Sequence, residues 1–172
     1  MKNSILKSIF LVSFLLLLIP SSAYSSEYVY KALTLDIPDC EVTGGGIANL
    51  PPYDSLLLSG KDWHMGFVDS GFMRHCRLIS EIDSTVSCER QDSIQMLDQL
   101  IKENSPATQI LFLSLPGDNI KRQEFKDYIL YSSTGLNKQS MAILVDKRTK
   151  KTTEISGKFN DSQLKWLRLK PL

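Results

Sequence analysis

Three cysteines and two histidines are the residues of this chain best suited to chemistry: Cys40, Cys76, Cys88, His64 and His75. A cysteine thiolate can attack a substrate, bind a metal or form a disulfide, and a histidine can act as a general base or a metal ligand. The spacing of His75-Cys76 with the other cysteines matches no zinc pattern, so we expect no metal and no other cofactor. A Cys–His nucleophile pair lacks a third residue to orient it. In an oxidising compartment, a disulfide is the expected use of these sulfurs.

The first 25 or so residues have the order of a secretory signal peptide. Lysines precede an apolar run over residues 9–19, and small residues follow it. That run has 11 residues, whereas a helix that spans a bilayer needs about 20, so we expect cleavage rather than anchoring. Removal of residues 1–23, or alternatively cleavage after Ser25, leaves one exported domain (24–172). We expect it to be periplasmic or secreted, with no membrane span.

Export favours one disulfide and leaves one thiol over, because there are three cysteines. The apolar residues around Cys76 and Cys88 fall on even positions, among them Leu78 and Val86. If this stretch is a hairpin, both cysteines face the same side, because side chains alternate along a strand. Cys76–Cys88 is therefore the preferred pair, and Cys40 with either one is the alternative.

The charge is unevenly distributed along the chain. Residues 24–105 include 6 basic and 13 acidic side chains, whereas residues 106–172 include 12 basic and 6 acidic side chains. One interpretation is that the two halves pack together and neutralise each other. The alternative is a basic face for an acidic partner, with its highest density at 147–151. No aromatic residues are interleaved there for base stacking, so we expect a protein partner and no nucleic acid.

Hydrophobic periodicity predicts an α/β domain with an N-terminal β extension. Residues 92–103 form the clearest helix, with Asp92 as its cap, and a triple glycine followed by Pro51-Pro52 places a loop over 39–53. Strands are expected at 27–37, 55–58, 63–68, 72–82, 85–88, 109–115, 140–145 and 151–155. Further helices are expected at 119–131 and after the cap Asp161, the last one with Leu164, Trp166 and Leu167. Helical crossovers predict a mixed sheet with parallel pairs, flanked by helices. An α+β domain with a mainly antiparallel sheet is the alternative.

The order of elements from residue 88 to residue 167 resembles the core of the thioredoxin fold. The strand 141–145, the hairpin after it and the last helix follow at nearly the spacing of that family. Thioredoxin-like oxidoreductases carry C-x-x-C at the start of the first helix, and the matching stretch 88–91 reads Cys-Glu-Arg-Gln. Ser140 stands where the family has its cis-proline. The resemblance implies a thioredoxin-like core without dithiol exchange, although a lone Cys88 thiol near a helix N-terminus is a candidate nucleophile.

Three functions are consistent with these observations. The first is a non-catalytic binding or accessory domain, which export and the missing second cysteine favour. The second is a divergent thiol-disulfide oxidoreductase or chaperone that uses Cys88. The third is a secreted inhibitor or effector that binds its target through the acidic or the basic half of the chain.

Overall fold

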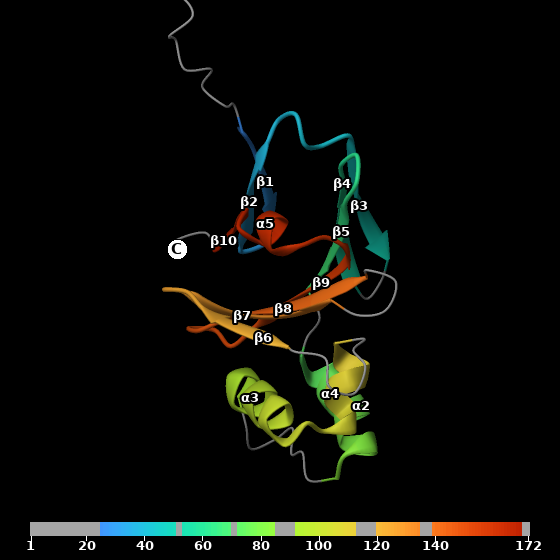
Figure 1. The fold of residues 1–172 in the computed structure, drawn as a ribbon, viewed down its shortest axis with the longest axis vertical. Coiled ribbons are helices and arrows are strands. Elements are labelled where there is room, and N and C mark those ends of the chain that lie inside the picture. Colours follow the sequence, from blue (N-terminus) through green and yellow to red (C-terminus); the bar gives the residue numbers. More distant parts are fainter. Residues whose placement is uncertain are drawn as a thin grey trace, which may run out of the picture.

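Figure 1 shows the computed structural model of the protein, which describes residues 25–50, 53–69, 72–84, 92–112, 120–134 and 139–169. The signal segment 1–23 and the strand expected at 85–88 lie outside these ranges. The described elements follow in chain order: β1 (Ser25–Tyr30), β2 (Leu33–Pro38), β3 (Gly44–Leu50), β4 (Tyr53–Ser59), β5 (His64–Val68), α2 (Phe72–Ile82), α3 (Ser93–Glu103), α4 (Pro106–Leu111), β6 (Lys121–Glu124), β7 (Tyr128–Thr134), β8 (Ser140–Asp146), β9 (Thr152–Lys158), α5 (Asp161–Leu164) and β10 (Leu167–Leu169).

The described strands form two sheets in which every described pair is antiparallel. The small sheet has the order β1-β2-β10, and the large sheet has the order β3-β4-β5-β9-β8-β7-β6. The strands β3, β4 and β5 therefore join the strands β6 to β9 where β9 pairs with β5. The last strand, β10, leaves the large sheet and pairs with β2, so the C-terminal part of the chain holds the small sheet in place.

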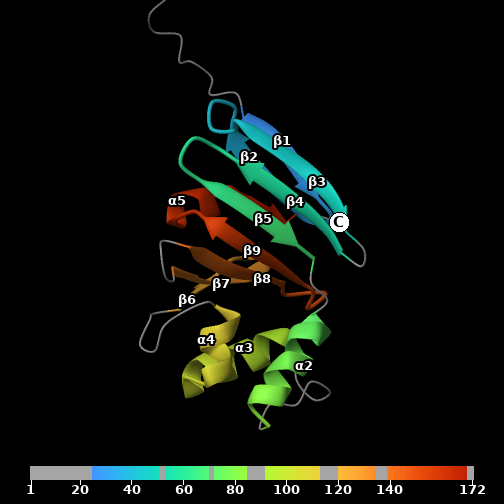
Figure 2. The ribbon, with the colours of Figure 1, turned by 90° about the vertical axis from the view of Figure 1, so that its right-hand side faces the viewer.

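The large sheet is covered on both faces, as the two views in Figures 1 and 2 show. The helices α2, α3 and α4 lie on one face, and the small sheet with α5 lies on the other. Strand β7 illustrates the consequence, because its side chains alternate between two cores. Tyr128 and Leu130 pack toward the small sheet, whereas Ile129 and Tyr131 pack toward the helices.

Helix α3 confirms the helix expected at 92–103. The carboxylate of Asp92 accepts hydrogen bonds from the backbone amides of Ile94 and Gln95, both at 2.9 Å. These bonds satisfy two amides that have no partner within the helix. Asn104 ends the helix in the left-handed conformation, with φ of 50°. Leu97 and Leu100 on the inner face are buried.

Three other expectations were wrong in the type of element. Residues 72–82 form helix α2 rather than a strand, and the described part of 109–115 continues from helix α4. Residues 119–131 contain the hairpin of β6 and β7 rather than a helix. The periodicity misled because Phe125, Tyr128 and Ile129 have helical spacing. In the structure Phe125 lies in the turn and stacks on Tyr128, with 4.5 Å between the ring centres.

The other strands expected within the described ranges are present, with changes at their ends. Strands β8 and β9 cover the segments expected at 140–145 and 151–155. The strand expected at 27–37 is divided into β1 and β2 by a turn at Lys31, where φ is 55°. The loop expected at 39–53 contains strand β3. The last helix ends at Leu164 and is followed by β10.

The fold therefore combines helices with mostly antiparallel sheets, as the alternative α+β expectation had it. The parallel pairs of the first expectation are not among the described strand pairs, and the thioredoxin-like core is not confirmed. None of the helices in the described ranges has the length and apolar character that a bilayer crossing requires.

Candidate functional site

The candidate site is an apolar groove of about 490 Å³ between strands β1 and β3. Tyr28 and Val29 line it from β1, and Ile47 lines it from β3. Leu56 and Leu58 of β4 form its floor and belong to the core between the two sheets. Within the described residues, Ile47 is the most exposed large apolar side chain, with 67% of its surface accessible. The groove thus presents apolar surface at the seam where the small and large sheets come together.

Both walls of the groove are edge strands. Among the described strands, β1 pairs only with β2, and β3 pairs only with β4. An edge strand presents a row of backbone N–H and C=O groups without strand partners. These groups of β1 and β3 border the same apolar surface, so the groove offers both backbone hydrogen bonding and apolar contact.

Strands β1 and β3 run in the same direction along the groove. At their starting end, the Ser26 hydroxyl donates to the carboxylate of Asp39, which lies in the loop that leads into β3. At the other end, the hydroxyl of the buried Tyr30 donates to the carbonyl of Asp54 on β4, beside the end of β3. The backbone amide of Asp69 donates to the same Tyr30 oxygen at 3.2 Å. These contacts hold β1 at a fixed distance from the large sheet.

Three consecutive glycines form the start of the β3 edge. A Cβ added at Gly45 would lie 2.7 Å from Cδ2 of Leu58 and 3.0 Å from the carbonyl oxygen of Leu57, so a larger residue there requires the Leu58 side chain to shift. A Cβ added at Gly46 would meet nothing within 4 Å. The edge is therefore bare backbone that another chain can approach closely.

The two ends of the groove differ in charge. At the end of β1, Nζ of Lys31 donates to Asp69 at 2.9 Å and lies 3.9 Å from Asp54. The hydrogen bond to Asp69 raises the pKa of the Lys31 ammonium group. At the opposite end, three exposed acidic side chains flank the starts of β1 and β3, namely Glu27, Asp39 and Glu41. The three side chains at the Lys31 end thus sum to a net charge of −1, whereas the three at the opposite end sum to −3.

The two cysteines in the described ranges, Cys40 and Cys76, do not line the groove. Cys40 is exposed and free in the loop after β2. Cys76 is disulfide-bonded and buried on α2, with its Sγ 3.3 Å from Sδ of Met96. Because Cys76 lies on a helix, the strand alternation that favoured its pairing with Cys88 does not apply. Cys88 lies outside the described residues, so both that pairing and its reactivity stay predictions.

The two histidines lie on different elements. His64 is exposed on β5, and His75 lies on α2. No group of three or more His, Cys, Asp or Glu side chains that could hold a metal occurs in the described ranges.

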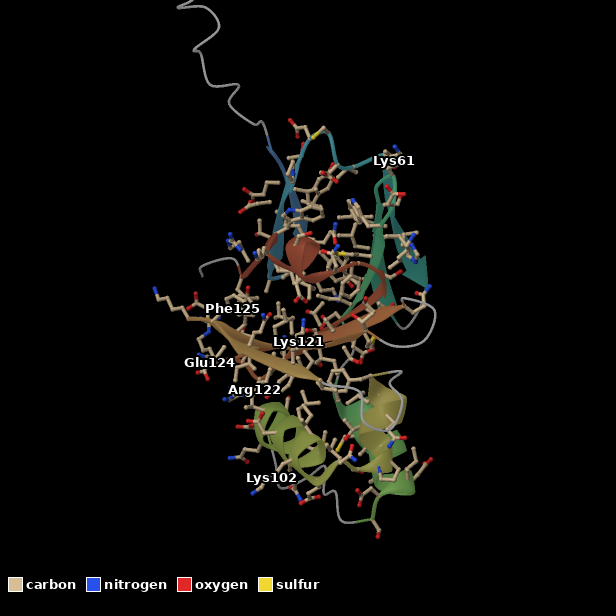
Figure 3. The ribbon with its side chains drawn as sticks, viewed as in Figure 1. Lys61, Lys102, Lys121, Arg122, Glu124 and Phe125 are labelled. Atoms are coloured by element: carbon tan, nitrogen blue, oxygen red, sulfur yellow. The ribbon has the colours of Figure 1, made fainter. Side chains whose placement is uncertain are left out.

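Ion pairs connect the acidic and basic halves of the chain. Arg122 of β6 lies between that strand and α3 (Figure 3) and donates to Asp98 at 2.8 Å. In the segment expected to be a basic face, Lys150 likewise lies 3.6 Å from Asp92 of the acidic half, while Lys147 donates to Glu124 at 2.8 Å within the basic half. These contacts agree with the interpretation that the two halves neutralise each other.

Comparisons with known proteins add no relative to this description: no protein-family model, curated protein or solved structure matches the chain.

Sequence reasoning missed the groove because it assigned 39–53 to a loop. The triple glycine was interpreted as a flexible turn, yet the apolar Ile47 follows it and the apolar run 56–58 follows Pro51-Pro52. Apolar segments on both sides of these prolines were the available signal for a hairpin. The position of β1 beside β3 had no local signal, since the two strands belong to different sheets.

Proposed function

We propose that this protein is an exported binding domain that takes an extended segment of another protein into the groove between β1 and β3. The observation that carries the proposal is that two unpaired strand edges border one apolar groove. A strand added between such edges gains backbone hydrogen bonds, while its alternate side chains reach apolar surface. The export signal and the absence of a second active-site cysteine support binding rather than catalysis.

The direction of the strands defines how the segment lies. Because β1 and β3 run the same way, one inserted strand can be antiparallel to both, which is slightly more stable per residue than parallel pairing. Its C-terminal end then reaches Glu27, Asp39 and Glu41. The preferred segment therefore has apolar residues at alternate positions and one or two basic residues at its C-terminal end.

Fluorescence polarisation with a labelled peptide tests this proposal directly. The probe is a peptide of about eight residues with valine and threonine alternating, followed by two lysines. We expect saturable binding that weakens when salt is added, because exposed charges at the groove end are screened. A peptide of the same sequence with N-methylated alternate amides is the matched control, since it keeps the side chains but removes backbone donors.

Two alanine variants locate the binding surface. Complete burial of an isoleucine side chain is worth about 1.5–3 kcal/mol. Since 67% of Ile47 is exposed, Ile47→Ala should lose about 1–2 kcal/mol of binding, or roughly 5- to 30-fold in Kd. Leu57→Ala is the control, because Leu57 is 53% exposed on the same sheet but does not line the groove. Equal effects of both variants, or unchanged affinity of the N-methylated peptide, would contradict the proposal.

A further inference from the structure

A second cavity, of about 270 Å³, lies between the large sheet and the segment that leads into α5. Lys121 of β6, Ser132 and Thr134 of β7, and Ser140 of β8 border it, together with Asn160 and Asp161. It is separate from the groove, since the two share no lining residue. Its volume lies just below the range of about 300–1,000 Å³ typical of ligand pockets, which limits an occupant to about one ring.

Ser132 gives this cavity a polar group that lacks a partner. Its residue surface is only 5% exposed, and its hydroxyl has no hydrogen-bond partner among the described residues. Strand alternation places its side chain on the same face as Leu130 and Thr134, toward the small sheet and the cavity. Its oxygen is not among the fully buried side-chain atoms without a partner, which in the described residues are Nε1 of Trp63 and Oγ of Ser133. The Ser132 hydroxyl is therefore open to the cavity, where a ligand can form a hydrogen bond with it.

Neighbouring side chains provide both donors and acceptors. The Ser140 hydroxyl donates to the carbonyl of Phe159 at 2.7 Å, which leaves its oxygen able to accept. The Asn160 side-chain oxygen accepts from the backbone amide of Ser162 at 2.8 Å, and the NH₂ of that amide remains a donor. Phe159 and Leu164, both buried, add an apolar side to the cavity.

The charges that border the cavity cancel. Nζ of Lys121 donates to Oδ2 of Asp161 at 2.6 Å, and both side chains are more than half exposed. An anionic ligand would lie against the Asp161 carboxylate, and a cationic ligand against the Lys121 ammonium. A neutral ligand with several hydroxyl groups can instead accept from Lys121 and donate to Asp161.

We infer that this cavity binds a single neutral sugar ring, either as a free monosaccharide or as the terminal residue of a glycan. The hydroxyl groups of such a ring match the mixed donors and acceptors, and its C–H face matches Phe159 and Leu164. This inference does not depend on the peptide groove, since it involves other residues on another part of the large sheet.

NMR titration of the ¹⁵N-labelled protein tests the inference. The probes are glucose, galactose, mannose and N-acetylglucosamine, with the methyl glycoside of each and one disaccharide that ends in each. We expect saturable shifts of the Ser132, Thr134 and Ser140 amides with at least one sugar. Tighter binding of the free sugar than of its glycosides indicates a monosaccharide as the ligand, and tighter binding of the disaccharide indicates a glycan end.

Adjacent serines provide a matched pair of variants. Ser132→Ala should weaken sugar binding about tenfold, because it removes the hydroxyl that faces the cavity. Ser133→Ala should leave the affinity within twofold. Ser133 also borders the cavity, but strand alternation directs its side chain to the opposite face, and its Oγ is buried without a partner. A thermal melt of each variant confirms folding, and Ser132→Ala is expected to fold because it removes an unpaired hydroxyl.

The inference is overturned by any of three results. The first is that no sugar in the panel causes saturable shifts at these amides. The second is that sodium phosphate or acetate causes the same shifts with equal affinity. The third is that Ser132→Ala and Ser133→Ala bind sugar equally well. Failure here leaves the peptide groove unaffected, because Ile47→Ala and its control are measured with a different probe.

Discussion

Replacement of Tyr131 by phenylalanine tests how the helical layer is attached to the large sheet. Tyr131 of β7 is fully buried, and its hydroxyl donates to Oδ1 of Asp98 on α3 at 2.8 Å. The same carboxylate oxygen accepts from Nε of Arg122 at 2.8 Å. Tyr131→Phe keeps the ring and its packing and removes only the hydrogen bond between sheet and helix.

The expected loss follows from the exposure of the acceptor. A hydrogen bond to a charged group is worth about 1.5–3 kcal/mol. The Asp98 side chain is 40% exposed, so solvent screens it, and Arg122 remains as a partner in the variant. We therefore expect the low end, about 1–1.5 kcal/mol, which corresponds to roughly 3–6 °C in Tm for a domain of this size.

Urea denaturation followed by circular dichroism measures this free energy of unfolding. Tyr28→Phe is the control, because Tyr28 is half-buried and its hydroxyl has no partner among the described residues; its effect should stay below about 0.5 kcal/mol. A double-mutant cycle with Asp98→Ala should give a coupling of about 1 kcal/mol. Wild-type stability of Tyr131→Phe, or simple additivity in the cycle, would refute the attachment of α3 through this bond.

Alkaline pH provides a second measurement on the same variant. Burial, and then the hydrogen bond to Asp98, raise the pKa of Tyr131 above its ordinary value of 10. The folded state therefore keeps this proton at a pH where the unfolded chain has released it. Stability is fully present below about pH 10 and is lost as the pH rises further. Tyr131→Phe should lose stability less steeply than the wild type above that pH.

Two further predictions concern single positions in the backbone. Gly157→Ala should lower the free energy of unfolding by more than about 2 kcal/mol, because φ is 145° there and the new Cβ would lie 2.2 Å from the backbone oxygen of His64. Gly66→Ala is the control, because its Cβ would meet only ordinary contacts at 3.7 Å. Urea denaturation should show almost no loss for this control. Asp92→Ala should cost about 1 kcal/mol as a lost helix cap. The Gln95 amide lowers the pKa of the Asp92 carboxyl, so this contribution should be present above about pH 4 and decline as the pH falls, and a cost of the variant that is independent of pH would contradict it.

Local signals predicted the elements whose ends are chemically marked. Helix α3 was predicted because Asp92 caps it and its apolar residues recur at helical spacing. The hairpin of β8 and β9 was predicted because two apolar or β-forming segments flank a polar turn. In each case the interactions that define the element lie within a few residues of it, so no distant contact was needed.

The wrong expectations share a physical cause, which is burial on two faces. Residues 128–131 are all buried because the sheet has helices on one side and the small sheet on the other. A strand in that position needs no polar alternation, so Tyr128, Ile129 and Phe125 could equally match a helix. Residues 72–82 show the opposite error, because they were expected to form a strand and form a helix. The position of Cys76 fits both patterns.

The sequence by itself determined the cap of α3, the β8–β9 hairpin and the mixture of helices with strands. The export signal is also read from the sequence alone and stays an expectation. Only the tertiary structure decided that all described strand pairs are antiparallel and that β1 and β3 border one groove. It also decided that Ser132 and Ser133 border a cavity and that the hydroxyl of Ser133 is buried without a partner. These properties arise from contacts between segments far apart in the chain, which composition and periodicity do not encode.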